Sequence, residues 1–270
     1  METGAEWVGA AAESADRQRR AASFGAAAGQ YAQHRPGYAE AAIRWCLAPV
    51  SGAEPVRVAD VGAGTGILTG ALARLGADVV AVEPDQAMLA ELRRGLPAVR
   101  AVEGSAEAIP LPDQSVDAVL CGQAMHWFDL DRALPEIARV LTPGGVLAGL
   151  WNVDDDRVGW VAELAEISKS ARTLSGWRAT PDPETERGSL RAGSSWFTPM
   201  EEREFGNAQL RSTDSLVATL ATHSRVLVMP VAEQVRLLAQ VRRYLASRPE
   251  TAEGEFDLPM VTSTLRTVRR

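Results

Sequence analysis

Apolar runs of strand length alternate with helical patterns along the middle of the chain. Residues 56–62 and 78–83 are continuous, β-branched apolar runs, which are typical of buried strands. The segment between them repeats apolar residues at helical spacing: Ile67, Leu68, Ala71, Leu72 and Leu75. Gly76 follows, at a place where glycine commonly ends a helix. This order predicts a strand, a helix and a second strand.

The alternation continues as far as residue 151. A second helix is expected to start at Pro84-Asp85, and further strands are predicted at 99–104, 115–122 and 146–151. The helix before the last of these strands has its apolar residues at i, i+3, i+4 and i+7, and a turn is expected at residues 143–145. Strands that alternate with helices indicate a parallel sheet joined by right-handed crossovers.

The flanking regions show weaker patterns. Residues 1–22 are rich in Ala, Gly, Glu and Arg and are expected to be a flexible lead-in, whereas a helix is expected at 39–47. The elements predicted after residue 151 are helices at 158–174, 214–222 and 231–245 and strands at 201–211 and 258–268. We therefore predict one α/β domain that covers residues 23–270.

The composition narrows the class of protein. The 270 residues are 46% hydrophobic and 23% charged, as in a soluble globular enzyme. A formal net charge of −7 opposes binding to phosphate backbones, so no nucleic-acid partner is expected. No apolar stretch reaches the ~20 residues of a membrane span, and no secretion signal is recognised. Cys46 and Cys121 lie in apolar runs, which favours buried, reduced thiols and a cytoplasmic location.

The candidate chemistry centres on VADVGAGTG, in which Gly62, Gly64 and Gly66 follow the first strand. A glycine-rich turn between a strand and a helix lets the backbone approach a ligand closely. The spacing is G-x-G-x-G, preceded by Asp60, which suits a cofactor without a pyrophosphate better than a dinucleotide. Glu83 ends the second strand, where a carboxylate can accept hydrogen bonds from ribose hydroxyls.

These two motifs resemble the first motifs of class I S-adenosylmethionine-dependent methyltransferases, of the variety called methyltransferase type 11. The likeness continues through EGSAEAIPLPDQSVDAVLCGQAMHWFD and ALPEIARVLTPGGVLAGLW, and HRPGYAE resembles trans-aconitate methyltransferase-like members. The resemblance implies a Rossmann-like class I methyltransferase fold: a seven-stranded, mostly parallel sheet with helices on both faces and an antiparallel last strand. It divides the domain into a cofactor-binding core at 23–151 and substrate-side and C-terminal elements at 152–270.

The resemblance implies S-adenosyl-L-methionine as cofactor and S-adenosyl-L-homocysteine as product. The methionine part would lie beside Asp60 and the glycines, the ribose beside Glu83, and the adenine near residue 105, where serine replaces the family's usual aspartate. Arg35 could pair with the cofactor's carboxylate. The cofactor-binding residues expected on this basis are Tyr31, Arg35, Asp60, Gly62, Gly64, Glu83, Pro84, Ser105, Ala106 and Gln123.

Each of these residues also has a structural interpretation. The glycines could serve only a tight turn, and Glu83 could be an exposed strand end. Asp60 could order the loop by accepting hydrogen bonds from its backbone amides, and Arg35 could be an ordinary surface charge.

Catalysis and acceptor binding are expected at the carboxyl ends of the fourth and fifth strands, the edge where open α/β sheets bind ligands. His126 is the candidate general base, because the ordinary pKa of histidine lies near neutrality. The expected acceptor contacts are His34, Trp127, Trp151 and Asn152. His126 and Trp127 could instead only form the wall of the site. No metal site is expected, since Asp154–Asp156 suit the start of a helix.

The function predicted from these residues is methyl transfer to an oxygen, carboxylate or hydroxyl, of a small molecule. A carboxylate acceptor requires no base, whereas a hydroxyl acceptor would use His126. The alternatives are a cofactor-binding protein with a non-methylating role, a protein methyltransferase and a nicotinamide-dependent oxidoreductase. A monomer or homodimer is expected, without a membrane partner.

Overall fold

The computed structural model describes residues 37–52, 54–168, 193–221 and 224–270. Its elements are, in chain order, α3 (Glu40–Leu47), η2 (Ala48–Val50), β1 (Arg57–Val61), α4 (Ile67–Arg74), β2 (Asp78–Glu83), α5 (Gln86–Gly95), β3 (Arg100–Glu103), β4 (Val116–Gly122), η3 (Met125–Trp127), α6 (Leu130–Val140), β5 (Leu141–Asp154), α7 (Gly159–Ser168), β6 (Glu201–Ser212), α10 (Thr213–Ala221), α11 (Ser224–Leu227), α12 (Val231–Ala246) and β7 (Glu255–Val268).

The strands form one seven-stranded sheet in the order β3-β2-β1-β4-β5-β7-β6. β1 to β5 pair in parallel, whereas β7 lies antiparallel between β5 and β6. The predicted mostly parallel sheet with an antiparallel last strand is therefore confirmed. Most of the predicted elements occur within one or two residues of their expected bounds, because their apolar periodicity reflects burial on the sheet.

Helices cover both faces of the parallel part of the sheet. Side chains of β5 alternate between the two faces, so that Leu147 packs with α6 residues such as Ile137, while Ala148 packs with Ile43 of α3 and Leu72 of α4. The two cysteines are fully buried and form no disulfide, and burial raises the pKa of both thiols. These two layers fix the positions of the strand ends.

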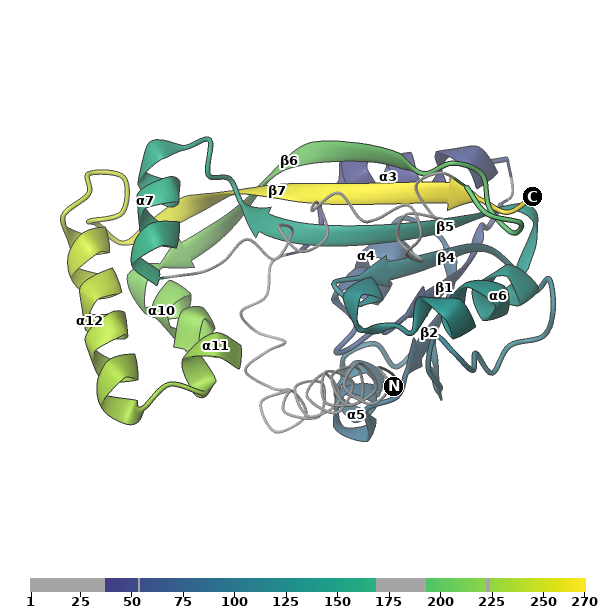
Figure 1. Cartoon of the computed structure of the whole chain (residues 1–270), viewed down its shortest axis with the longest axis horizontal. Helices are drawn as coiled ribbons and strands as arrows, with labels where there is room; N and C mark the ends of the chain where they lie inside the picture. The colour runs from purple at the N-terminus through teal and green to yellow at the C-terminus, as the bar shows by residue number, and fades with distance from the viewer. Residues whose placement is uncertain (1–36, 53, 169–192, 222–223) are drawn as a thin grey trace, which may run out of the picture.

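The outer three strands extend the sheet far beyond its parallel part. β5 and β7 have 14 residues and β6 has 12, whereas β1 to β4 have four to seven. Their extensions carry a helical lobe, which consists of α7, α10, α11 and α12 (Figure 1). The lobe has its own apolar core, formed with the first half of β7: Trp160, Leu216, Leu220, Val241, Leu245, Phe256 and Leu258.

Two local expectations for the fifth strand are wrong. β5 begins at Leu141 and includes the predicted turn at 143–145, where its register with β4 shifts. It also continues past Trp151 to Asp154, because β7 pairs with it as far as Met260. The first part of the helix expected at 158–174 is α7, and residues 169–174 lie outside the described part of the chain. None of the helices in the described residues is long and apolar enough to cross a membrane.

Candidate active site

The predicted site residues meet at the carboxyl edge of the parallel strands. Gly62 follows β1, Glu83 ends β2 and Gln123 follows β4, and parallel strands bring these ends to one edge of the sheet. β5 runs past this edge to the helical lobe, which lies beyond the strand ends (Figure 1). A ligand at this edge would therefore lie between the core and the lobe.

The glycine loop requires glycine for two different reasons. Gly62, Gly64 and Gly66 all have positive φ angles, of 72°, 57° and 89°. A side chain at residue 62 would also place its Cβ 2.6 Å from that of Ala124. The amides of Gly62 and Ala63 donate to the carbonyl of Val82, at 2.9 and 3.1 Å, so β2 holds the loop in place. The tight-turn interpretation is thus correct for the backbone, and it leaves a ligand role open.

Glu83 connects this loop to the start of the next helix. Its side chain is 6% exposed, so the alternative of an exposed strand end is wrong. One carboxylate oxygen accepts from the amide of Gly64 at 2.8 Å, and the other accepts from that of Asp85 at 2.9 Å. Burial raises the pKa of Glu83, and these two amide hydrogen bonds oppose the shift. Pro84, which follows, is exposed.

Asp60 is fully buried on β1, behind the loop. Its Oδ2 accepts from the hydroxyl of Thr69 in α4 at 2.6 Å, while Oδ1 has no hydrogen-bond partner in the described part of the chain. The structural interpretation expected Asp60 to accept from the amides of the loop, whereas its side chain accepts from α4. Burial, together with the nearby charge of Glu83, raises the pKa of Asp60 to about 7, and the hydrogen bond from Thr69 opposes this shift.

Asp60 and Glu83 together make this edge electrostatically negative. The charged groups that shift their pKa values, among the residues described, are other carboxylates: Glu83 acts on Asp60, and Asp85 acts on Glu83. A buried carboxylate is costly without a compensating positive charge. The site therefore suits a cationic ligand, such as a cofactor with a sulfonium and an ammonium group, and would repel a pyrophosphate.

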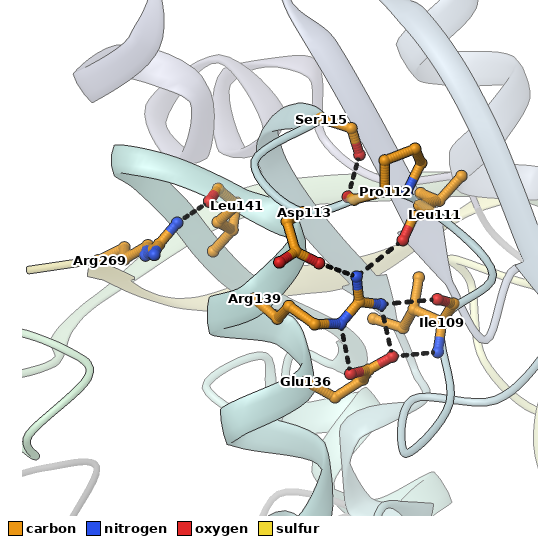
Figure 2. Close-up of polar contacts among 9 residues, drawn as sticks. All are labelled: Ile109, Leu111, Pro112, Asp113, Ser115, Glu136, Arg139, Leu141 and Arg269. Carbon is orange, nitrogen blue, oxygen red and sulfur yellow. Dashed lines mark hydrogen bonds and ion pairs between the residues drawn. The ribbon is translucent and has the colours of Figure 1, made fainter.

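The expected adenine side is a loop that α6 holds in place. Ser105 and Ala106 lie in the segment between β3 and β4, where Ser105 is half-buried and Ala106 belongs to the core. In Figure 2, the guanidinium of Arg139 donates to the carbonyls of Ile109 and Leu111, at 3.0 and 2.9 Å. The part of this loop that follows Ser105 and Ala106 is therefore held by α6.

Arg139 also forms ion pairs with Asp113 and Glu136, at 2.6 and 2.8 Å, and Glu136 accepts from the amide of Ile109 (Figure 2). The guanidinium lowers the pKa of Glu136. Sequence reasoning missed this pair, because Glu and Arg three residues apart look like an ordinary surface pair on a helix.

Gln123 lies immediately after β4 in an unusual conformation, with a φ of 56°. Its amide donates to the carbonyl of Leu150 at 2.8 Å, and its side-chain Nε2 donates to that of Asn152 at 3.0 Å. The strained backbone and both hydrogen bonds direct this residue to the end of β5 rather than to solvent.

His126 and Trp127 lie on the short helix η3, which follows β4. Both are half-buried, and their ring centroids are 4.8 Å apart. The indole Nε1 of Trp151 donates to Nδ1 of His126 at 3.4 Å. An indole nitrogen can only donate, so this contact favours the tautomer of the neutral imidazole that bears its hydrogen on Nε2.

Trp151 and Asn152 have internal roles that the sequence did not indicate. Trp151 is 2% exposed and packs in the core on the α6 side, so it reaches the site through His126. The side chain of Asn152 is also buried and donates to the carbonyl of Gly37 at 3.1 Å. Both side chains are thus buried in the protein. Their assignment as acceptor contacts stays a prediction.

Tyr38 also lies at this edge, although the sequence analysis did not name it as a binding residue. A Cβ at Gly122 would lie 2.5 Å from the hydroxyl of Tyr38, so this phenol lies against the end of β4. It belongs to the sequence HRPGYAE, whose resemblance to trans-aconitate methyltransferase-like proteins was the signal for this segment. Tyr31, His34 and Arg35 lie outside the described residues. Within the described part of the chain, no group of three potential ligands could hold a metal ion.

Comparisons with known proteins identify the family of this chain. A family described as a methyltransferase domain matches residues 59–149. The chain is 41% identical over 252 residues to an uncharacterised methyltransferase of Mycobacterium bovis, and the match covers 93% of this chain and 97% of that protein. The similarity therefore extends over the core and most of the lobe.

Two further matches are more partial or more distant. A malonyl-[acyl-carrier protein] O-methyltransferase of Methylococcus capsulatus is 38% identical over 132 residues, which is 47% of this chain and 46% of that protein. A solved structure from Anaeromyxobacter dehalogenans, described as a type II methyltransferase, has a TM-score of 0.60 at 28% identity and covers 87% of this chain and 97% of its own.

Proposed function

Because this chain belongs to the class I S-adenosylmethionine-dependent methyltransferases, we propose that it methylates a carboxylate oxygen of a small molecule. The cofactor, S-adenosylmethionine, supplies an electrophilic methyl group when bound. The protein's part is to hold the acceptor oxygen in line with that group and to exclude water. The observation that carries the choice of a carboxylate is the hydrogen bond from Trp151 to His126.

We assign the cofactor to the edge formed by the glycine loop and Glu83. The buried carboxylates of Asp60 and Glu83 suit its positive charge, and Glu83 has further lone pairs with which to accept from ribose hydroxyls. Ser105, Ala106 and Gln123 are assigned by resemblance to its adenine and methyl ends. Tyr31 and Arg35 are likewise assigned by resemblance.

The role proposed for His126 is that of a hydrogen-bond donor. A base acting through Nδ1 would have to take up a proton against the indole N–H of Trp151, which already points to that nitrogen. With its hydrogen on Nε2, the neutral imidazole can instead donate to an acceptor oxygen. An ionised carboxylate needs such a donor and no base, whereas a hydroxyl would need a base.

Two resemblances support a carboxylate acceptor. The malonyl-[acyl-carrier protein] O-methyltransferase matches about half of this chain, and its named substrate is a carboxylic acid. The sequence HRPGYAE resembles trans-aconitate methyltransferase-like proteins, whose named substrate is also a carboxylic acid. We place the acceptor, with His34 and Trp127 as candidate contacts, between this edge and the helical lobe.

The test is to incubate the protein with methyl-labelled cofactor and a panel of small mono-, di- and tricarboxylic acids and phenols. A methyl ester, which alkali hydrolyses, is expected from one of the acids. An alkali-stable ether, label on added protein, or cofactor binding without any transfer would contradict the proposal. Each of these outcomes corresponds to one alternative.

The same assay tests the role of His126. At saturating substrates, kcat should stay constant from about pH 6 to 9, because the reaction does not require a deprotonated side chain as general base. His126→Gln, which retains a donor near the position of Nε2, should keep about tenfold more activity than His126→Phe. If kcat rises through about pH 6.5 in the wild type but not in the two variants, His126 is the general base after all.

A further inference from the structure

A buried polar network connects the three long strands to the start of α3. Asn152 of β5 pairs in register with Thr262 of β7, whose hydroxyl donates to the Oδ1 of Asn152 at 2.7 Å. Asn207 of β6 lies beside them, with its Nδ2 at 3.2 Å from both the Oδ1 of Asn152 and the hydroxyl of Thr262. Each of the three outer strands thus contributes one side chain.

The network holds the backbone on both sides of Tyr38. The carbonyl of Gly37 accepts from Nδ2 of Asn207 at 2.8 Å and from Nδ2 of Asn152 at 3.1 Å. The amide of Ala39 donates to the hydroxyl of Thr262 at 3.1 Å. The two residues that flank Tyr38 are therefore fixed by side chains that are more than 100 positions away in the chain.

The same network reaches the end of β4 by a second route. The backbone carbonyl of Asn152 accepts from the side chain of Gln123, which follows β4 directly. Tyr38 lies against Gly122, the last residue of that strand. Both routes from Asn152 therefore end at the same point of the carboxyl edge, where the methyl end of the cofactor is assigned.

We propose that Thr262 and Asn207 are positioning residues for the cofactor site, which hold Tyr38 and Gln123 at the end of β4. This inference rests on the cofactor's placement at the carboxyl edge and is independent of the acceptor. Neither residue lies on the glycine loop or on the strands that carry it. Their effect on the cofactor would pass through the backbone of residues 37–39 and through Asn152.

Burial makes the network sensitive to the loss of one partner. Thr262 is fully buried and Asn152 is 7% exposed, so water cannot replace a missing hydroxyl. Removing that hydroxyl leaves the oxygen of Asn152 and the amide of Ala39 each with one hydrogen bond fewer. The residue that precedes α3 would then lose its hydrogen bond to β7.

The test compares Thr262→Val with Thr264→Val by calorimetric titration with S-adenosylmethionine. Thr264 is the matched control: it lies two residues further along β7, is 2% exposed, and its hydroxyl donates to the carbonyl of Arg203 at 2.7 Å, away from residues 37–39. Both variants should lose similar thermal stability. Only Thr262→Val should raise the Kd, by about tenfold, and Thr262→Ser should restore it.

Asn207→Ala provides a second measurement, because this residue is half-buried on the edge strand and its truncation should leave the fold intact. It should weaken cofactor binding at an unchanged melting temperature. Equal Kd values for Thr262→Val and Thr264→Val, or a wild-type Kd for Asn207→Ala, would overturn the proposal. Failure to find an acceptor would leave this comparison unaffected, since its readout is binding alone.

Discussion

The α/β core and the helical lobe differ in what determines their structure. In the core, the site is fixed by backbone geometry: positive φ angles in the glycine loop, strand ends and amides that bind Glu83. The lobe consists of amphipathic helices around an apolar cluster, joined to the core through β5, β6 and β7. The comparison teaches that the parallel part of the sheet and the lobe have separate apolar cores, which can be perturbed one at a time.

The largest effect should come from removing one large side chain from either core. Leu245→Ala in the lobe and Leu72→Ala in α4 should each cost about 2–5 kcal/mol, since both leucines are fully buried. Hydrogen exchange should accelerate in α7, α10 and α12 for the first variant and in β1 and β2 for the second. The Kd for the cofactor should increase only for Leu72→Ala. Equal loss of cofactor binding in both variants would show that the two regions act as one unit.

A smaller effect is expected within the core when one carboxylate is removed. Glu83→Ala should weaken cofactor binding by about a hundredfold, because the amides of Gly64 and Asp85 lose their acceptor together with the ribose contact. Glu103→Ala is the matched control, since Glu103 pairs with Glu83 in register at the end of β3 but is exposed. Calorimetric titration measures the Kd for the cofactor in both variants. Similar values would show that Glu83 does not contribute to cofactor binding.

The smallest effect concerns pH. Burial raises the pKa of Asp60 from 3.8 to about 7, so the folded state retains a proton that the unfolded chain has lost. This residue therefore lowers stability progressively as pH rises from about 4 to 7, and its contribution is constant above that range. Asp60→Asn should gain stability over the wild type across this range, as measured by thermal melting at each pH.

Cofactor binding should show the opposite sign. A cationic ligand favours the ionised form of Asp60, so binding below about pH 7 should release protons and strengthen as pH rises. Titrations in buffers of different ionisation enthalpy measure this release. A release that persists in Asp60→Asn would assign it to another group.

The sequence predicts the arrangement of the glycine loop and Glu83 well, because its signals are local. Gly62, Gly64 and Glu83 belong to a strand–turn–helix pattern that is legible within 25 residues, and the structure brings them together through hydrogen bonds. The buried thiols and the alternation of strands and helices along the chain follow from apolar runs of the same local kind.

The contacts that the sequence does not predict are long-range. Nothing near Trp151 indicates that β5 continues to Asp154, because the partner strand β7 is about a hundred residues away. The hydrogen bond that sets the tautomer of His126 joins residues 25 apart on different elements. Arg139 likewise looks like a surface residue until the loop at 109–113 folds over it. Such contacts depend on tertiary packing rather than on residue spacing.

The place of β7 between β5 and β6 has a consequence for protein synthesis. A nascent chain emerges from the ribosome N-terminal end first, so β5 forms long before its neighbour β7 is made. During that interval one edge of β5 is unpaired, and β6 emerges before the strand with which it pairs. Open strand edges promote aggregation, so this interval is the one in which a chaperone would be of most use. Synthesis of residues 255–268 then closes the sheet and joins core to lobe in one step.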